Sequence, residues 1–215
     1  MSTICHFSED LSPSLLQEIH SCLAQDGVLS VPTESFYALS APIDNTRSLR
    51  RLRAIKQLPA EKPLLVLIGE RAELSQLTSD IPPAATLLIQ AYWPGPLTLV
   101  FPASPHLPEE LTGGIHTIGI RQPGDRRLCA LLQEVGPLTG TSANHTGALP
   151  ARTAKEVQQL FEPQVDLILD GGEAPGGMPS TILSLVGEVR LLRQGPITET
   201  QINQVLTPLG LTIAQ

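Results

Sequence analysis

The residues whose types and spacing could support chemistry gather in the stretch 137–147. The short apolar segment 135–138 predicts a strand, and hydroxyl side chains, a primary amide and a glycine follow it. A strand that ends in small polar side chains leaves N–H groups and hydroxyls free for a ligand, as at the carboxyl ends of strands in α/β proteins. A polar turn has the same composition. This stretch therefore leaves a ligand site and a plain turn as alternatives.

A hydrolase is one chemistry to weigh, because residues 140–144 read G-x-S-x-N, close to a nucleophile elbow around Ser142. In the α/β-hydrolase order the histidine comes last in the chain. The one histidine after Ser142 is His145, which is too close in sequence to act as an independently positioned base. The other histidines precede Ser142 and would require a different triad order. The histidine positions disfavour acyl-enzyme hydrolysis.

Familiar phosphate and metal motifs are absent from the sequence. Residues 171–176 have the G-x-x-x-x-G spacing of a P-loop, but Gly177 and Met178 stand where Lys and Ser/Thr are needed. No G-x-G-x-x-G follows a predicted strand, and the histidines show neither HExxH nor H-x-E spacing. We interpret 171–181 as a mobile lid or a turn that carries Ser180, and we expect any divalent ion to arrive with nucleotide phosphates.

Charge and composition narrow the classes of protein. The formal net charge is −7, from 14 basic and 21 acidic residues, which argues against a broad nucleic-acid footprint but leaves room for a local basic pocket. A run of basic residues between positions 47 and 62 is typical of a solvated helix face. That run consists of Arg47, Arg50, Arg51, Arg53, Lys56 and Lys62. The 3 cysteines form no C-x-x-C pair and indicate neither a disulfide framework nor a zinc site.

Targeting signals are not evident in the sequence. The N-terminus lacks a basic stretch followed by an apolar run, and no apolar run approaches the ~20 residues that span a bilayer. We therefore expect a cytoplasmic protein without a signal peptide or membrane partner.

Hydrophobic periodicity predicts strands alternating with helices. The pattern predicts helices over 12–26, 46–56, 71–77, 83–91, 125–134, 153–161 and 198–208. It predicts strands over 28–31, 64–68, 97–101, 117–121 and 167–169, a loop over 102–116, and a hairpin that turns at 187–188. This order is typical of an α/β protein, and the hairpin makes its sheet mixed. We expect a single domain over 1–215.

Four of the predicted strand ends carry polar side chains: 32–35, 117–121, 141–144 and 180–181. If these ends converge with Lys56, Lys62 and Arg193, they form a pocket rich in hydroxyls and cations. Such a pocket suits an anion with a polar body, such as a nucleotide. Each end taken alone is equally explained by capping or turn formation.

A series of motifs, in order along the chain, resembles a known family. They are Pro32-Thr33-Glu34-Ser35-x-Tyr37, Lys56 with Pro59 and Pro63-Leu64, Trp93-Pro94-Gly95-Pro96-Leu97-Thr98, Ile118-Gly119-Ile120-Arg121-x-Pro123, Thr141-Ser142-Ala143-Asn144, Asp170-Gly171-Gly172, Pro179-Ser180-Thr181 and Leu192-Arg193-x-Gly195. Together they resemble the YrdC-like family of threonylcarbamoyl-AMP synthases over about residues 12–196.

The resemblance implies a YrdC-like fold, a twisted mixed β-sheet flanked by helices around a concave cavity. It also implies a nucleotidyltransferase that joins L-threonine, bicarbonate or carbon dioxide, and ATP. The products would be threonylcarbamoyl-adenylate and pyrophosphate. A tRNA-modifying transferase complex would use the adenylate to make threonylcarbamoyladenosine in tRNA.

The resemblance also implies site residues. Threonine would be held by Ser35, Arg121, Ser142 and Ser180, with Arg121 on its carboxylate. ATP would be held by Lys56, Lys62, Thr117, Asn144, Thr153 and Arg193, with Lys56 and Arg193 as the catalytic cations. Nucleotidyl transfer depends on in-line positioning and positive charge on the phosphates more than on a nucleophile. Mg²⁺ is expected with ATP, without a recognisable protein ligand motif.

Some positions depart from the family pattern. Many synthases have Lys-x-Arg where this chain has Lys56-Gln57-Leu58, so one phosphate-side cation is replaced. Ala38, Ser35 and Leu67 also replace a usual glycine, a common threonine and a histidine of some members. The variants near Tyr37 and Leu58 resemble the YciO branch. The alternative is therefore a YciO-like protein that binds a nucleotide or RNA without efficient synthase turnover, with weak RNA binding at most.

Overall fold

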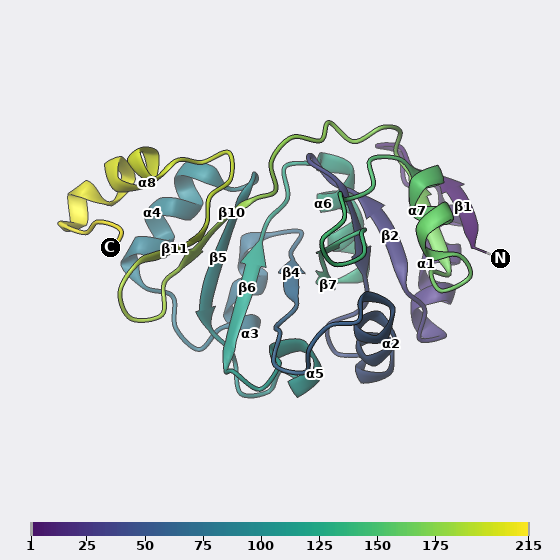
Figure 1. Ribbon diagram of the computed structural model, residues 1–215, viewed down its shortest axis with the longest axis horizontal. Coiled ribbons are helices and arrows are strands. Elements are labelled where there is room, and N and C mark those ends of the chain that lie inside the picture. The colour runs from purple at the N-terminus through teal and green to yellow at the C-terminus, as the bar shows by residue number, and fades with distance from the viewer. Residues whose placement is uncertain (1, 215) are drawn as a thin grey trace.

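The computed structural model describes residues 2–214, which form two mixed β-sheets lying side by side with helices packed around them (Figure 1). The first sheet has the strand order β1-β9-β2-β3-β8, and the second has the order β11-β10-β5-β6-β4-β7. The segment 171–180 leaves β9 of the first sheet and crosses to β10 of the second (Figure 1).

Strands of the first sheet are short and well buried in its centre. They are β1 (Thr3–His6), β2 (Leu29–Pro32), β3 (Tyr37–Ser40), β8 (Thr141–Ser142) and β9 (Leu167–Asp170). Strand β9 pairs in parallel with β1 and β2, whereas β3 is antiparallel to β2 and β8. Every residue of β2 and β3 is buried, as expected of central strands covered on both faces.

The second sheet is also mixed. Its strands are β4 (Leu65–Leu67), β5 (Leu97–Pro102), β6 (Thr117–Arg121), β7 (Leu138–Thr139), β10 (Thr181–Ser184) and β11 (Arg190–Arg193). Strands β5 and β10 pair in parallel, as do β4 and β6, and the other three pairings are antiparallel. The register places Leu67 opposite Arg121, so the ends of β4 and β6 meet at one edge of the sheet.

Most of the longer helices begin at a side-chain cap. The helices are α1 (Pro13–Ala24), α2 (Thr46–Lys56), α3 (Leu74–Leu77), α4 (Pro83–Tyr92), α5 (Glu109–Thr112), α6 (Arg126–Val135), α7 (Ala154–Phe161) and α8 (Glu199–Leu206), with 3₁₀ turns at Arg71–Glu73 and Thr207–Leu209. Ser12, Asn45, Asp125, Thr153 and Thr198 each accept a hydrogen bond from a first-turn N–H group. Among the described residues, no helix combines the length and apolarity needed to cross a bilayer.

Aliphatic side chains dominate the interior, and the larger apolar cluster contains residues of both sheets. It includes Tyr37 and Leu39 of β3 together with Val66 of β4 and Ile118 of β6. A second cluster lies under α1 and α6 and includes Phe7. Burying each large aliphatic side chain contributes roughly 1.5–3 kcal/mol, so a shared interior couples the two sheets.

The structure confirms the α/β class with mixed pairing, and divides the expected sheet into two. The expected strand over 135–138 is wrong at its start, because Val135 continues the apolar stripe of Leu128, Leu131 and Leu132 and belongs to α6. The expected loop 102–116 contains the short helix α5. Strands β1 and β3 were not predicted, and β2 extends to Pro32, which pairs with Tyr37.

Candidate functional site

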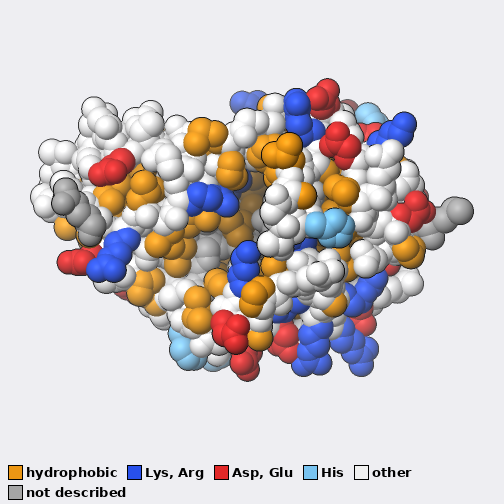
Figure 2. All heavy atoms as spheres, in the orientation of Figure 1, with side chains coloured by type: hydrophobic (Ala, Val, Ile, Leu, Met, Phe, Trp, Pro, Cys, Tyr) orange, Lys and Arg blue, Asp and Glu red, His pale blue; other side chains and the backbone are white. Residues whose placement is uncertain are grey.

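A cavity of about 320 Å³ lies between the two sheets. Its wall combines residues of β3 and β8 from the first sheet with residues of β4, β6 and β10 from the second. Figure 2 shows this hollowed face, with hydrophobic side chains within it and Lys and Arg side chains at its margin. The four polar strand ends converge here, because Ser35, Arg121, Ser142 and Ser180 all line the cavity.

The cavity is cationic. Lys62, Arg121 and Arg193 line it, and no acidic residue stands among the described residues that do. Within residues 2–214, Arg121 is the one of these three that forms an ion pair within 4.0 Å, and its partner is Glu34. An electropositive cleft in a protein of net charge −7 concentrates anions at this position.

Arg121 is fixed from the protein side. Its Nη2 pairs with Glu34 Oε1, and its Nε donates to the carbonyl oxygen of Gly95 at 3.0 Å. The residue is only 5% exposed, at the end of β6. A buried, oriented guanidinium presents its remaining N–H groups to a carboxylate in a defined direction.

Arg193 and Ser180 form a second fixed unit at the cavity. The Nε and Nη2 atoms of Arg193 donate to the carbonyl oxygen of Ser180 at 3.0 and 2.8 Å, and Nη2 also lies 3.1 Å from Ser180 Oγ. Ser180 Oγ in turn shares a hydrogen bond of 2.9 Å with Thr98 Oγ1. Partial burial of the guanidinium and the nearby charge of Arg121 lower the pKa of Arg193.

Lys56 holds the turn that follows β8. Its Nζ donates to the carbonyl oxygen of Ser142 at 2.6 Å, to Asn144 Oδ1 at 2.9 Å and to the carbonyl oxygen of Asn144. Asn144 is further engaged, because Oδ1 accepts from Ser142 Oγ at 2.7 Å and Nδ2 donates to the carbonyl oxygen of Ala148 at 2.7 Å. Burial, and then the charge of Lys62, lower the pKa of Lys56 to about 8. An ammonium group has three donors, and this turn occupies all three.

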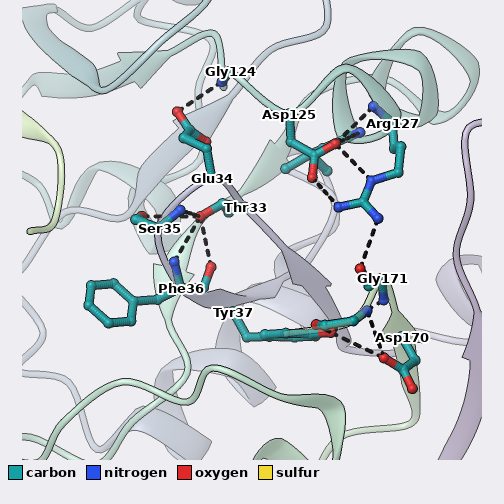
Figure 3. Close-up of polar contacts among 12 residues, drawn as sticks. Thr33, Glu34, Ser35, Phe36, Tyr37, Gly124, Asp125, Arg127, Asp170 and Gly171 are labelled. Atoms are coloured by element: carbon teal, nitrogen blue, oxygen red, sulfur yellow. Dashed lines mark hydrogen bonds and ion pairs between the residues drawn. The ribbon is translucent and has the colours of Figure 1, made fainter. Parts of the chain in front are cut away.

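The turn between β2 and β3 is closed by Thr33 (Figure 3). Thr33 Oγ1 accepts from the N–H groups of Ser35 and Phe36, each at 3.2 Å, and donates to the carbonyl oxygen of Phe36 at 2.7 Å. These bonds hold Ser35 at the cavity, as expected of a local hydroxyl-centred turn.

Tyr37 connects the same turn to the crossing segment 171–180 (Figure 3). Its hydroxyl donates to the carbonyl oxygen of Gly172 at 2.7 Å and lies 3.4 Å from Asp170 Oδ1. Gly176 N also donates to the carbonyl oxygen of Ser35 at 2.7 Å. Burial raises the pKa of Tyr37 to about 12, so the phenol remains a neutral donor. The segment that carries Ser180 is therefore anchored to the turn that carries Ser35.

One wall of the cavity is apolar. Leu58, Leu65, Leu67 and Ile182 line it. A Cβ atom on Gly140 would lie only 2.5 Å from Leu67 Cγ, so the close packing of β4 against this segment requires glycine. Leu58 occupies the wall where the family resemblance leads us to expect an arginine.

The structure brings together six of the ten predicted site residues. Ser35, Lys62, Arg121, Ser142, Ser180 and Arg193 line the cavity. Asn144 lies in the turn behind Ser142, and Lys56, at the end of α2, is hydrogen-bonded to that turn. Thr117 begins β6, opposite Pro102 and at the end away from Arg121, and Thr153 caps α7 by accepting from Glu156 N. Neither threonine lines the cavity.

Several residues in the cavity wall or in contact with it were not predicted from the sequence. Gly95 contributes a backbone oxygen, for which side-chain chemistry gives no signal. Ile182 and Pro150 carry no polar group that would single them out. Leu65 was predictable, because Leu65 and Leu67 alternate along one strand and must share a face.

Metal ligands do not gather at the site. Within residues 2–214 there is no group of three or more His, Cys, Asp or Glu side chains that could hold a metal ion. Glu34, the carboxylate beside Arg121, already accepts from that guanidinium and from Gly124 N.

Fold and site together define an α/β protein with a cationic, hydroxyl-lined cavity between two mixed sheets. Residues 21–195 match the Sua5, YciO and YrdC family, which carries the description "Telomere recombination". The chain belongs to this family.

Curated relatives carry the name threonylcarbamoyl-AMP synthase. The chain is 35% identical to that of Bacillus subtilis over 190 residues, which are 87% of this chain and 55% of the relative. It is 36% identical to that of Thiobacillus denitrificans over 168 residues, which are 78% of this chain and 89% of the relative. A Pyrococcus abyssi relative of the same name is covered to 61% of its length, so the chain spans little more than half of the longer relatives.

Solved structures share the fold. The chain resembles Pyrococcus abyssi Sua5 complexed with L-threonine with a TM-score of 0.90 and 29% identity, over 99% of this chain and 63% of that one. It resembles Escherichia coli YciO with a TM-score of 0.80 and 28% identity, over 91% of this chain and 97% of that one.

Proposed function

We propose that this chain is a threonylcarbamoyl-AMP synthase, a nucleotidyltransferase that forms threonylcarbamoyl-adenylate and pyrophosphate from L-threonine, bicarbonate or carbon dioxide, and ATP. The names of the curated relatives support this proposal. The observation that carries it is the cavity itself, where predicted threonine residues and predicted ATP residues line one space.

The threonine end would lie at Arg121. Its guanidinium, fixed by Glu34 and Gly95, would bind the amino-acid carboxylate, and Ser35, Ser142 and Ser180 would supply hydroxyls around the rest of the molecule. The threonine amine adds to carbon dioxide with loss of a proton, or condenses with bicarbonate with loss of water, to give a carbamate. A carbamate oxygen then attacks the α-phosphorus of ATP, and pyrophosphate leaves with the electron pair of the broken P–O bond.

The phosphates would lie at Lys62 and Arg193, the two cavity cations without an ion-pair partner among the described residues. Positive charge placed where charge develops stabilises a phosphoryl transition state. Lys56 would act through the Ser142–Asn144 turn, since its ammonium donors are occupied there. Contacts of Thr117 and Thr153 with ATP remain predictions from the family resemblance.

Magnesium would accompany ATP as part of the substrate. Mg²⁺ prefers oxygen ligands, retains several waters and is commonly held through substrate phosphates. The described residues offer no cluster of carboxylates for it, so its ligands would come from the triphosphate and water. Its chemical contribution would be to neutralise the phosphate oxygens and the leaving pyrophosphate.

The product determines the partners that this proposal requires. An acyl-adenylate hydrolyses readily, so a tRNA-modifying transferase complex would have to collect it for threonylcarbamoyladenosine formation. We expect this to occur in the cytoplasm. The net charge of −7 supports weak direct RNA binding at most.

A second candidate function is that of a YciO-like protein that binds a nucleotide or RNA without efficient synthase turnover. Two observations favour it: the likeness to YciO, and Leu58 in the cavity wall. Loss of one electrostatic donor can cost on the order of 10² to 10³ in rate.

Pyrophosphate release separates the two candidates. The full chain is incubated with ATP, Mg²⁺, L-threonine and bicarbonate, and release is compared with an ATP-only blank. Threonine-dependent release, with the adenylate identified by mass spectrometry, is the result expected. An absence of threonine-dependent release from protein that still binds ATP would contradict the synthase proposal and favour the YciO-like one. An RNA titration at increasing salt then tests the RNA form of that alternative.

A further inference from the structure

We propose that Glu34 is a positioning residue, which fixes the guanidinium of Arg121 and offsets its charge so that the cavity takes a carboxylate in one orientation rather than any anion. The identity of that carboxylate as part of L-threonine rests on the proposed function. The control of Arg121 by Glu34 does not, because it follows from contacts within the chain.

The geometry of the Glu34–Arg121 pair fixes the guanidinium in one plane. Glu34 Oε1 pairs with Nη2 of Arg121, while Nε of the same guanidinium donates to the carbonyl oxygen of Gly95. Two contacts on one side fix the guanidinium plane. Among the described residues Nη1 has no protein partner, and Arg121 lines the cavity. The planar fork therefore retains donors for one further planar anion.

The charge of Glu34 acts in a largely buried setting. The side chain of Arg121 is 7% exposed and that of Glu34 is 24% exposed, so the pair is largely withdrawn from water. Lys62 and Arg193 have no such carboxylate partner among residues 2–214. A buried guanidinium without a counter-charge would attract any anion, including phosphate, strongly. Glu34 offsets that attraction at Arg121 alone and leaves the other two cavity cations for phosphates.

The backbone at Gly124 makes space for the Glu34 carboxylate. Gly124 N donates to Glu34 Oε1 at 2.9 Å, and Figure 3 shows the carboxylate pointing at that N–H group. A Cβ atom on Gly124 would lie 3.1 Å from Oε1 and 3.3 Å from Cδ, tighter than ordinary contact. The turn that follows Arg121 therefore receives Glu34 closely because residue 124 has no side chain.

The second carboxylate oxygen of Glu34 is left without a hydrogen bond. Oε2 of Glu34 is buried and has no hydrogen-bond partner among the described residues. A buried polar atom without a partner costs stability. A pair selected for stability alone would use both oxygens in a bidentate contact, and this one uses a single oxygen shared between Arg121 and Gly124. The arrangement thus fixes the orientation of the Arg121 guanidinium, although a bidentate pair would contribute more stability.

Charge and position can be separated with three variants. Glu34→Gln keeps the shape and removes the charge, Glu34→Asp keeps the charge on a shorter arm, and Gly124→Ala keeps the carboxylate but displaces it. Glu188→Gln is the matched control, because Glu188 forms an ion pair with Arg190 in which both side chains are mostly exposed. Each variant is checked for folding by circular dichroism and denaturant titration.

Binding of inorganic phosphate, measured by calorimetry, tests the charge without any turnover. We expect Glu34→Gln to bind phosphate about tenfold more tightly than wild type, since a buried charge has lost its partner. Adding Arg121→Gln to this variant should abolish the gain, and Glu34→Asp, Gly124→Ala and Glu188→Gln should not show it. Phosphate affinity of folded Glu34→Gln within twofold of wild type would overturn the role of charge.

Kinetics test the position. We expect Glu34→Gln and Gly124→Ala to lower kcat for threonine-dependent pyrophosphate release about tenfold without raising KM for L-threonine, and Glu34→Asp to recover part of kcat. The positioning role would be overturned if the variants lost activity only in proportion to their unfolded fraction, with kcat per folded molecule and KM unchanged. If wild type neither binds L-threonine nor releases pyrophosphate, the proposed function fails, and the phosphate measurements still decide the role of Glu34.

Discussion

Helix α2 and the cavity are both rich in cations, but the two regions differ in whether those cations have carboxylate partners. On α2, Arg47, Arg50 and Arg51 form ion pairs with carboxylates, and Arg53 donates to backbone carbonyl oxygens. The carboxylate partners are Asp26, Glu110 and Asp166. The helix therefore has little unbalanced charge to offer a ligand.

In the cavity the balance is reversed. Lys62 and Arg193 line it without a carboxylate partner within 4.0 Å among the described residues, and Arg121 shares the one nearby carboxylate, Glu34. The comparison shows that the density of basic residues along a sequence does not locate an anion site. What locates it is cations for which the fold provides no counter-charge. The interpretation of 47–53 as a largely solvated helix face agrees with this arrangement.

Lys56 connects the two regions. It is the last residue of α2, yet it is 5% exposed and its Nζ is bound to the turn that carries Ser142. It turns inward, toward backbone and amide oxygens of the protein.

Replacing one arginine in each region should give the largest difference in catalytic efficiency between two variants. We expect Arg193→Gln to reduce kcat/KM for ATP on the order of 10² to 10³, because one phosphate-side charge is lost. Arg50→Gln on α2 should stay within about twofold of wild type, since an exposed ion pair contributes little. Initial rates of pyrophosphate release measure both. Equal losses in the two variants would remove the distinction between paired and unpaired cations.

Removing the lysine that bridges the two regions should give the next largest effect. Lys56→Met leaves three oxygen acceptors of the turn without their donor, so we expect a loss of about 1–3 kcal/mol in the free energy of unfolding. We also expect kcat to fall about 10²-fold through misplacement of the turn. Urea titration and turnover measure the two effects. Lys155→Met, at an exposed position, is the control; a change of rate with unchanged stability would argue for direct phosphate contact instead.

The two regions differ in how much of their structure could be predicted from the sequence. For α2 the sequence was sufficient, because the apolar stripe of Leu49, Leu52 and Ile55 and the cap at Asn45 are local features. The convergence of polar strand ends was also predictable, because such ends gather at sheet edges in α/β proteins. The cavity is lined by Ser35, Arg121 and Ser180, in agreement with that expectation.

The parts that could not be predicted depend on contacts between distant segments. Gly95 reaches Arg121 because β5 pairs with β6, whereas Glu34 reaches it from the other sheet, and neither residue has a local signature. Strand β3 was not predicted, because its burial on both faces removes the alternation that marks a strand. The division into two sheets likewise depends on which strands pair, since the hydrophobic pattern of a single strand does not specify its partner.

Adding a cation to the cavity should raise ATP affinity and turnover, by a smaller factor than the losses expected above. Leu58→Arg introduces a guanidinium into the apolar wall, where the family pattern places one. We expect ATP affinity and the rate of threonine-dependent pyrophosphate release to rise, by about tenfold for one new charge-assisted contact. Leu58→Met, which adds no charge, is the control. A wild type that is inert beside an active Leu58→Arg variant would identify the chain as a lapsed synthase.

The smallest expected effect is a shift along the pH axis. Burial and the charge of Lys62 lower the pKa of Lys56 to about 8, so its third donor is lost from the turn as pH rises through this value. We expect kcat to decline above about pH 8. In Lys62→Gln the pKa of Lys56 should rise, because the repelling charge is gone, and the decline should move to higher pH even though the rate is lower throughout.

The free energy of unfolding should change with pH in the direction opposite to kcat. The two effects of deprotonating Lys56 can therefore be measured separately. The pKa of Lys56 is about 8 in the folded chain and 10.5 in a free side chain, so the unfolded chain binds more protons between these values. The contribution of Lys56 to the free energy of unfolding therefore rises with pH across this window, while kcat falls. Urea titrations and kcat profiles from pH 7 to pH 10, with Lys155→Gln as the control, measure both. A kcat decline that Lys62→Gln leaves in place would show that the charge of Lys62 does not set it, and would detach the bridging lysine from the charge balance of the cavity.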